Sequence, residues 1–211
     1  MPGCAAISRT ATASSLSRGG AVSSEKPMAE AANEPECVPD GSIPANGRPL
    51  KVGVVADTHN ILNETARREL RGVDMILHAG DVVDPAILDD LSQIAPVRAV
   101  RGNCDYYEPT YRIHVLRETL QIQLGGYRIF VVHKLPEANP SLMPPAFYSR
   151  WKEWNPRVAV FGHTHRPEKV EKNGILFFNP GSPSRPRRSR ASIGILHLWP
   201  DEVVAEHIVV D

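Results

Sequence analysis

The sequence has few cysteines, few aromatic residues and no excess of charge of either sign. Its three cysteines, Cys4, Cys37 and Cys104, are an odd number, and two of them lie in the amino-terminal segment. This usage argues against a disulfide framework and favours a reducing compartment, so a cytoplasmic location is expected. The 24 basic and 24 acidic side chains cancel, which predicts neither a nucleic-acid partner nor a membrane partner.

Long apolar runs are also absent. No stretch has the length of a transmembrane helix, and the amino-terminal segment lacks the continuous apolar core of a secretory signal. A chain of 211 residues with 42% hydrophobic side chains fits one soluble domain of the α/β class.

Residues 1–49 differ from the rest of the chain. They contain no Phe, Trp or Tyr, and Leu16 is their only leucine. Such a segment cannot bury enough apolar surface to offset the entropy of ordering it, so we expect a disordered tail over 1–49 and a folded domain over 50–211. Before Glu25 the tail carries arginine, serine and alanine but no acid. Organelle transit peptides share that composition, and an unstructured leader, or a true start near Met28, explains it equally well.

From residue 51 onward, short apolar runs alternate with helical segments. Residues 51–56, 75–79 and 97–100 are apolar runs that are too short for helices, so they predict buried strands. Alternation of strand and helix is typical of right-handed βαβ units with a parallel sheet.

Three helices are expected. One begins after Asn63, which is a good N-cap, and a second follows Asp84-Pro85, an N-cap with proline at the first helical position. The third covers residues 144–155, where aromatic side chains at helical spacing favour packing into a core over a substrate platform. These aromatics are Phe147, Trp151 and Trp154.

The second half of the chain is rich in hairpins. Residues 119–132 turn at Gly-Gly, residues 169–178 at Asn-Gly, and residues 192–210 near Pro-Asp. The expected architecture is a partly parallel β-sandwich with helices on its outer faces.

Potential metal ligands close several of the apolar runs. They are Asp57, His59, Asp81, Asn103, His133, His163 and His165. Carboxylates, amide oxygens and imidazoles bind hard or borderline divalent metals. Because the ends of successive strands gather at one edge of an α/β sheet, these side chains can converge in one crevice. The series therefore predicts a binuclear metal site.

Each ligand taken alone also has an ordinary structural interpretation. Asp57 with His59, and His163 with His165, are spaced so that an extended backbone turns both side chains the same way, but such pairs also occur in plain turns. Asp81 fits a turn, and a single strand-end histidine is often structural. The order of the whole series at strand ends favours the metal site.

The series resembles the motifs of calcineurin-like metallophosphoesterases, which run D-x-H, G-D, G-N-[HC]-D, a lone His and G-H-T-H. The Asn-Pro-Gly-Ser sequence at residues 179–182 resembles the small phosphodiesterase branch related to the retromer scaffold subunit. The resemblance covers residues 51–210 and implies a four-layer α/β/β/α sandwich.

The resemblance also implies a ligand assignment and a reaction. One metal ion is held by Asp57, His59, Asp81 and His165, and the other by Asp81, Asn103, His133 and His163, so that Asp81 bridges them. Two divalent ions are expected, manganese first, with iron, zinc or nickel as alternatives. A hydroxide bridging the ions attacks phosphorus in line. Asn103, His165 and Asp81 are the expected catalytic residues.

Two positions depart from the family pattern. Cys104 stands where many members carry a histidine, and a thiol with a pKa of about 8.5 is a poorer proton donor without positive charge. This predicts weak turnover of poor leaving groups and a preference for diesters or activated esters. After His133 the chain continues with Lys134 and a proline-rich stretch to Pro145, which is expected to shape or cover the substrate pocket. Lys134 is either solvated or a phosphate contact.

Other basic residues have two interpretations. The run Arg185, Arg187, Arg188 and Arg190 is either a solvated loop or a collar for anionic substrates such as nucleotides. His78 is a candidate to contact and orient the metal ligands without binding a metal itself.

The sequence thus favours a metal-dependent phosphoesterase, in particular a phosphodiesterase acting on a small or nucleotide-like substrate. The rival is a non-catalytic scaffold, because the retromer subunit resembles the same branch. A retired site is expected to have lost ligands, and every ligand position here is filled. Nucleic-acid binding through the arginines is disfavoured by the neutral charge, and the oligomeric state is not predicted.

Overall fold

The computed structural model describes residues 44, 47–107 and 116–211. Most of the tail predicted over residues 1–49 lies outside this part of the chain, so its disorder stays a prediction. Among the described residues, no helix is long and apolar enough to cross a membrane.

One five-stranded sheet has the order β10-β9-β1-β2-β3. Its parallel part consists of β1 (Leu50–Val55), β2 (Met75–His78) and β3 (Val97–Ala99). Two antiparallel strands, β9 (Ser192–Leu198) and β10 (Val203–Val209), extend it from β1. The predicted βαβ units and the last hairpin are therefore confirmed.

The other five-stranded sheet has the order β4-β5-β6-β8-β7. Its outer strands, β4 (Thr119–Leu124) and β7 (Pro167–Lys172), are antiparallel to their neighbours. Its inner strands, β5 (Tyr127–Val132), β6 (Val158–Val160) and β8 (Ile175–Pro180), run parallel. Both predicted hairpins of this region form, and β6 inserts between them.

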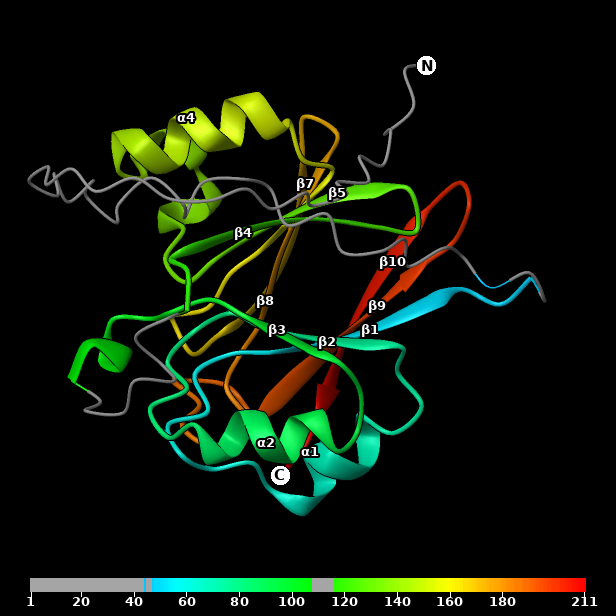
Figure 1. The fold of residues 1–211 in the computed structure, drawn as a ribbon, viewed down its shortest axis with the longest axis vertical. Helices are drawn as coiled ribbons and strands as arrows, with labels where there is room; N and C mark the ends of the chain where they lie inside the picture. The colour runs from blue at the N-terminus through cyan, green and yellow to red at the C-terminus, as the bar shows by residue number, and fades with distance from the viewer. Residues whose placement is uncertain (1–43, 45–46, 108–115) are drawn as a thin grey trace, which may run out of the picture. The chain divides into compact units, whose positions relative to one another are not determined.

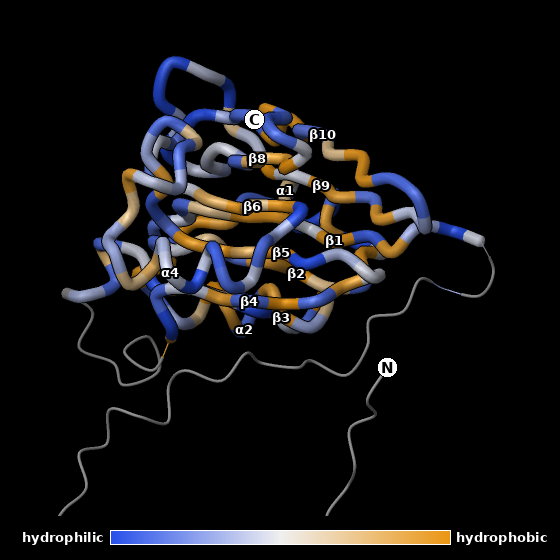
Figure 2. The backbone as a smooth tube through the Cα atoms, turned by 90° about the horizontal axis from the view of Figure 1, so that it is seen from above, coloured by the Kyte–Doolittle hydropathy of each residue, from blue (hydrophilic) through white to orange (hydrophobic). Residues whose placement is uncertain are grey.

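The two sheets share a buried core, and each packs against helices on its other face. The core between the sheets includes Val54, Leu77, Val131, Val160 and Phe178. Apolar residues follow the central strands in Figure 2. Neighbouring strand residues alternate between this core and the outer ones, which explains why the inner strands are buried on both sides.

Helices complete the outer layers (Figure 1). The helices α1 (Glu64–Glu69) and α2 (Ala86–Ser92) pack on the first sheet through a second apolar cluster, and α4 (Pro145–Trp154) packs on the second sheet through a third. Short 3-10 turns occur at Cys104–Tyr107, Pro136–Ala138 and Pro140–Leu142. The predicted four-layer α/β/β/α sandwich is confirmed.

The start of α1 follows the predicted capping, whereas α2 begins one residue later than predicted. Asn63 Oδ1 accepts a hydrogen bond of 2.7 Å from the backbone N–H of Ala66. The helix α2 begins at Ala86, with Pro85 at the N-cap position, and Asp84 Oδ1 accepts from the N–H of Ala86 at 2.9 Å. Asp84 is thus an exposed capping acid and not a member of the ligand series.

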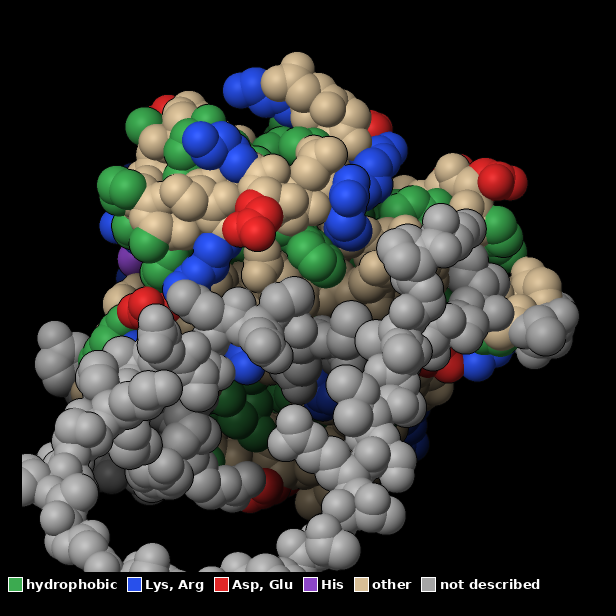
Figure 3. Space-filling view, turned by 45° about the horizontal axis from the view of Figure 1, so that its top comes forward, with side chains coloured by type: hydrophobic (Ala, Val, Ile, Leu, Met, Phe, Trp, Pro, Cys, Tyr) green, Lys and Arg blue, Asp and Glu red, His purple; other side chains and the backbone are tan. Residues whose placement is uncertain are grey.

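The surface carries both signs of charge. Figure 3 shows basic and acidic side chains spread over the face that it displays. This mixture agrees with the neutral formal charge of the chain.

Candidate metal centre

Four of the predicted ligands form one buried group at the ends of β1, β2 and β6. In this group, Asp57, His59, Asp81 and His165 each offer an atom within 4.8 Å of the others. His59 Nε2 lies 3.3 Å from His165 Nε2 and 3.7 Å from Asp81 Oδ2. His165 Nε2 lies 3.5 Å from Asp57 Oδ1.

The remaining predicted ligands form a second group against the other side of Asp81. Asn103 Oδ1 lies 3.1 Å from His133 Nε2 and 2.9 Å from His163 Nδ1. His133 Nε2 lies 3.4 Å from Asp81 Oδ1. The two oxygens of the Asp81 carboxylate therefore face two different sets of ligands, and the structure brings all seven predicted residues together.

The backbone at this site differs from the extended geometry expected for the closely spaced pairs. Asp57, His59, Asp81, His163 and His165 all have positive φ, between 43° and 72°. Left-handed backbone at non-glycine residues costs on the order of 1 kcal/mol each and persists only where surrounding contacts enforce it. The side chains of each pair converge through left-handed turns.

Hydrogen bonds between loops enforce this backbone. The N–H groups of Asp57 and His59 donate to the carbonyls of Gly80 and Asp81 at 3.0 and 3.1 Å. The N–H of Gly162 donates to the carbonyl of His133 at 3.0 Å. The loops after β1 and β2, and those after β5 and β6, are thereby fixed to one another.

Two glycines allow these loops to approach closely. At Gly80, where φ is +87°, a Cβ atom would lie 2.7 Å from His133 Nδ1 and 2.9 Å from the Cα of Gly102. A Cβ atom at Gly102 would overlap Asp81. Any larger residue at either position would displace a ligand.

Sequence reasoning missed the role of Asp105. This fully buried carboxylate accepts from the N–H groups of Asp81 (3.0 Å), Gly102 (2.7 Å) and Val83 (2.7 Å). It fixes the loops that carry Asp81 and Asn103. The available signal was its place as the last residue of the G-N-C-D motif.

The Asn-Pro-Gly-Ser motif also holds the ligand loops. Ser182 Oγ donates to the carbonyl of Asp57 at 2.7 Å and accepts from the N–H of Arg185 at 2.9 Å. Asn179 Nδ2 donates to the carbonyl of Gly162 at 2.9 Å. The motif therefore connects the D-x-H loop to the G-H-T-H loop.

Backbone carbonyls set the tautomers of two ligand histidines. The Nδ1 atoms of His133 and His165 lie 2.8 and 2.6 Å from the carbonyls of Ala79 and Arg185. A carbonyl can only accept, so Nδ1 carries the proton and, in the neutral ring, Nε2 presents a lone pair to the cluster.

His78 lies behind the cluster as predicted. The N–H of Gly80 donates to its Nδ1 at 3.2 Å, so its Nε2 carries the proton and donates to Thr58 Oγ1 at 3.0 Å. Burial lowers the pKa of His78 to about 3, which keeps the ring neutral. It supports the loops of Thr58 and Gly80 and does not face the two groups.

Burial also changes the proton affinity of the ligands. It raises the pKa of Asp57 to about 8, with a further contribution from the Asp81 charge. Burial lowers the pKa of His59, His163 and His165. Burial alone would raise the pKa of Asp81, but His133 and the N–H of Cys104 hold that pKa below the ordinary value. The imidazoles of His59, His163 and His165 are therefore uncharged at neutral pH.

Cys104 lies beside the second group. Its N–H donates to Asp81 Oδ1 at 2.8 Å, and Asn103 Nδ2 donates to its sulfur at 3.4 Å. Burial raises the pKa of the thiol to about 11. The side chain next to Asn103 is thus protonated and uncharged at neutral pH.

The basic residues near the site separate into two kinds. The charge of Arg187 is close enough to act on the pKa of Asp57, and that of Lys134 on the pKa of His163. Arg190 instead pairs with Asp211 at 2.7 Å on the surface. Arg187 therefore fits the interpretation as part of a collar, and Arg190 the interpretation as a surface charge.

The sequence of this chain is similar to those of known phosphoesterases. Residues 50–199 match the model of the calcineurin-like phosphoesterase superfamily domain. A probable metallophosphoesterase of Methanothermobacter thermautotrophicus is 33% identical over 164 residues, covering 75% of this chain and 92% of the relative. Phosphodiesterase YfcE of Escherichia coli is 31% identical over 171 residues, covering 70% of this chain and 87% of the relative.

Solved structures share the fold. The structure of YfcE matches with a TM-score of 0.52 at 26% identity, over 76% of this chain and all of that one. Vacuolar protein sorting 29 of Cryptosporidium parvum matches with a TM-score of 0.59 at 21% identity, over 77% of this chain and 99% of that one. With the domain match, these similarities show that the chain belongs to the calcineurin-like phosphoesterase superfamily.

Proposed function

We propose that the chain is a metal-dependent phosphoesterase, and specifically a phosphodiesterase that holds two divalent metal ions. The observation that carries the proposal is the position of Asp81, whose two carboxylate oxygens face separate ligand groups. The names of the relatives, a metallophosphoesterase and a phosphodiesterase, support it.

The polar atoms of the cluster fit cations. His133 Nε2 and Asn103 Oδ1 are both acceptors when the imidazole is neutral, yet they lie 3.1 Å apart with no donor between them. His165 Nε2, also a lone pair, lies 3.3 Å from His59 Nε2, which can donate or accept according to its tautomer. Two acceptors that face each other repel unless a positive charge lies between them. The mixture of nitrogen and oxygen ligands suits manganese, iron, zinc or nickel.

The two ligand groups define which residues would hold each ion. Asp57, His59, Asp81 and His165 would hold one, and Asp81, Asn103, His133 and His163 the other. Two such ions supply an activated water nucleophile and neutralise charge on the phosphate. We place manganese first among the candidate metals.

The remaining chemistry belongs to the side chains themselves. Asn103 turns its oxygen to the histidines, and its amide N–H group is the donor that can reach a phosphate oxygen. Asp81 and His165 keep their orientation because backbone groups of Cys104 and Arg185 bind them. Lys134 adds a positive charge beside His163 for an anionic ester. The proposed substrates are small or nucleotide-like phosphodiesters.

The non-catalytic scaffold explains the site less well. Vacuolar protein sorting 29 shares the fold at 21% identity. A scaffold needs neither seven convergent ligands nor the strained backbone that presents five of them.

Matched substitutions test the proposal. Asp81→Asn removes the charge between the two groups, whereas Asp84→Asn removes an equal charge from an exposed cap 3 residues along the chain. We expect hydrolysis of bis(p-nitrophenyl) phosphate with added manganese to fall by at least about a hundredfold in Asp81→Asn and to persist in Asp84→Asn. Equal activity of the two variants would reject the proposal.

A further inference from the structure

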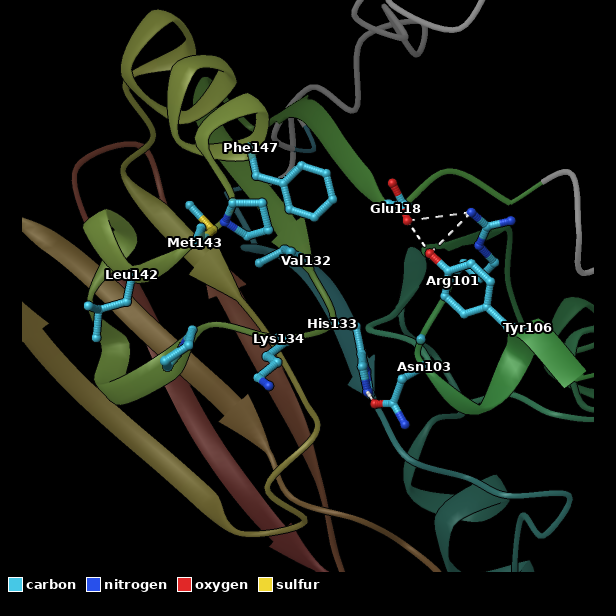
Figure 4. Close-up of a pocket in the computed structure, with 13 residues that line it drawn as sticks. Arg101, Asn103, Tyr106, Glu118, Val132, His133, Lys134, Leu142, Met143 and Phe147 are labelled. Carbon is cyan, nitrogen blue, oxygen red and sulfur yellow. Dashed lines mark hydrogen bonds and ion pairs between the residues drawn. The ribbon is translucent and has the colours of Figure 1, made fainter. Parts of the chain in front are cut away.

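A pocket of about 530 Å³ opens from one end of the ligand cluster (Figure 4). It meets the cluster at Asn103 and His133, and none of Asp57, His59, Asp81 or His165 lines it. A volume of this size is typical of small-molecule sites. The pocket is therefore a lateral extension of the site.

One wall of the pocket is apolar. It is formed by the end of β5, the loop after it and the start of α4, with Val132, Leu142, Met143 and Phe147. Leu142 is 50% exposed, next to the buried Met143. Phe147 packs against the third apolar cluster and also faces the pocket, so the prediction that it belongs to the core describes only part of its role.

The opposite wall is a fixed aromatic with a polar edge. The guanidinium of Arg101 lies 4.2 Å from the centre of the Tyr106 ring, and the Tyr106 hydroxyl donates to Glu118. Arg101 Nη2 lies 3.5 Å from Glu118 Oε1. These contacts hold Tyr106 in place although its side chain is 49% exposed. The wall is therefore an aromatic ring held by Arg101 over one of its faces and by Glu118 at its hydroxyl.

The other side of the cluster has a different character. A second pocket of about 490 Å³ next to His163 is lined by charged side chains, namely Glu137, Arg166, Glu168 and Arg187. An apolar substituent of a substrate is therefore expected on the Asn103 side only.

We propose that the pocket between Tyr106 and Phe147 binds the ester substituent that stays on phosphorus, and that this substituent is a flat aromatic or nucleobase-containing group. This inference rests on the proposed function. In an in-line displacement the leaving group departs opposite the attacking water, whereas the retained substituent projects sideways. A lateral pocket with an apolar wall and an aromatic wall fits the retained group.

The test uses three diesters with the same p-nitrophenolate leaving group. Their retained substituents are methyl, benzyl and thymidine-5′, and the full chain is loaded with manganese. We expect kcat/KM for the benzyl and thymidine esters to exceed that of the methyl ester by about tenfold. A preference for the thymidine ester alone would identify a nucleoside as the occupant of the pocket. A preference for both the benzyl and the thymidine esters would identify a flat ring in general.

Substitutions connect the preference to the pocket. Leu142→Trp fills the pocket, and we expect the ratio of kcat/KM for the benzyl ester to that for the methyl ester to fall to about one. Phe147→Ala removes part of the apolar wall and is expected to lower the same ratio. Val204→Trp, at a residue 42% exposed on β10, serves as a control with an unchanged ratio. Calorimetry gives an independent readout, because benzyl phosphate is expected to bind about tenfold more tightly than methyl phosphate to the wild type only.

Two failures are distinguishable. A wild-type ratio near one, or a preference that both pocket variants retain, overturns the pocket inference while the methyl ester is still cleaved. Absence of manganese binding and of hydrolysis of all three esters overturns the proposed function as well.

Discussion

Removal of divalent metal is predicted to destabilise the chain at alkaline pH, and Asp57 is the reason. Its carboxyl is fully buried, and burial raises its pKa to about 8 from the ordinary value of 3.8. Between these two values the native state keeps a proton that the unfolded chain has released, so stability falls as pH rises. At roughly 1.4 kcal/mol per pKa unit, the loss at pH 8 approaches about 5 kcal/mol. Typical domains have a total stability of only about 5–15 kcal/mol.

Asp57→Asn isolates this effect. Its side-chain oxygen can still accept from the N–H of His163, as Asp57 Oδ2 does at 2.9 Å, but the charge is absent. In chelator, the variant is expected to be more stable than the wild type, and its advantage to grow by roughly 3 kcal/mol between pH 5.5 and pH 8. Urea unfolding at the two pH values measures this difference.

Asp84→Asn removes an exposed carboxylate, so its stability relative to the wild type is expected to be independent of pH over this range. Saturating manganese is expected to reverse the order, making the wild type more stable than Asp57→Asn. A difference between wild type and Asp57→Asn that stays constant with pH in chelator refutes the reasoning.

Three further predictions concern residues around the ligands. Burial lowers the pKa of His78 to about 3, so on acidification the unfolded chain takes up a proton before the folded chain does. Between pH 6.5 and pH 4, the free energy of unfolding should therefore fall by roughly 3 kcal/mol more in the wild type than in His78→Gln. Urea unfolding at the two pH values measures this difference. Asp105→Asn replaces an acceptor of three backbone N–H groups, so calorimetry should show about 10- to 100-fold weaker manganese binding. Cys104→His should raise monoester relative to diester hydrolysis in steady-state assays, and an unchanged ratio contradicts the argument about the leaving group.

Much of the fold followed from local sequence signals. The Gly125-Gly126 and Asn173-Gly174 turns join strands at the predicted places, because these residues accept the positive φ of tight hairpins. Asn63 caps its helix as its side-chain chemistry suggests. The convergence of seven ligands followed from strand-end positions and parallel topology.

Other features depend on contacts between distant segments. The left-handed turns at Asp57 and His59 are stabilised by carbonyls after β2, which local spacing cannot reveal. Asp105 was recognisable only as a motif letter, because its three N–H partners come from two loops. The lateral pocket needs Tyr106 and Phe147 from different parts of the fold. The loop after His133, predicted to shape or cover the substrate pocket, supplies part of its lining.

The number of manganese ions bound per chain tests the central claim most directly. Equilibrium dialysis of the folded wild type, followed by metal analysis, is expected to give two ions per chain. Asp81→Ala is expected to lose both the second ion and the hydrolysis of bis(p-nitrophenyl) phosphate. A folded wild-type chain that binds no manganese, together with an Asp81→Ala variant that keeps whatever activity is seen, contradicts the account.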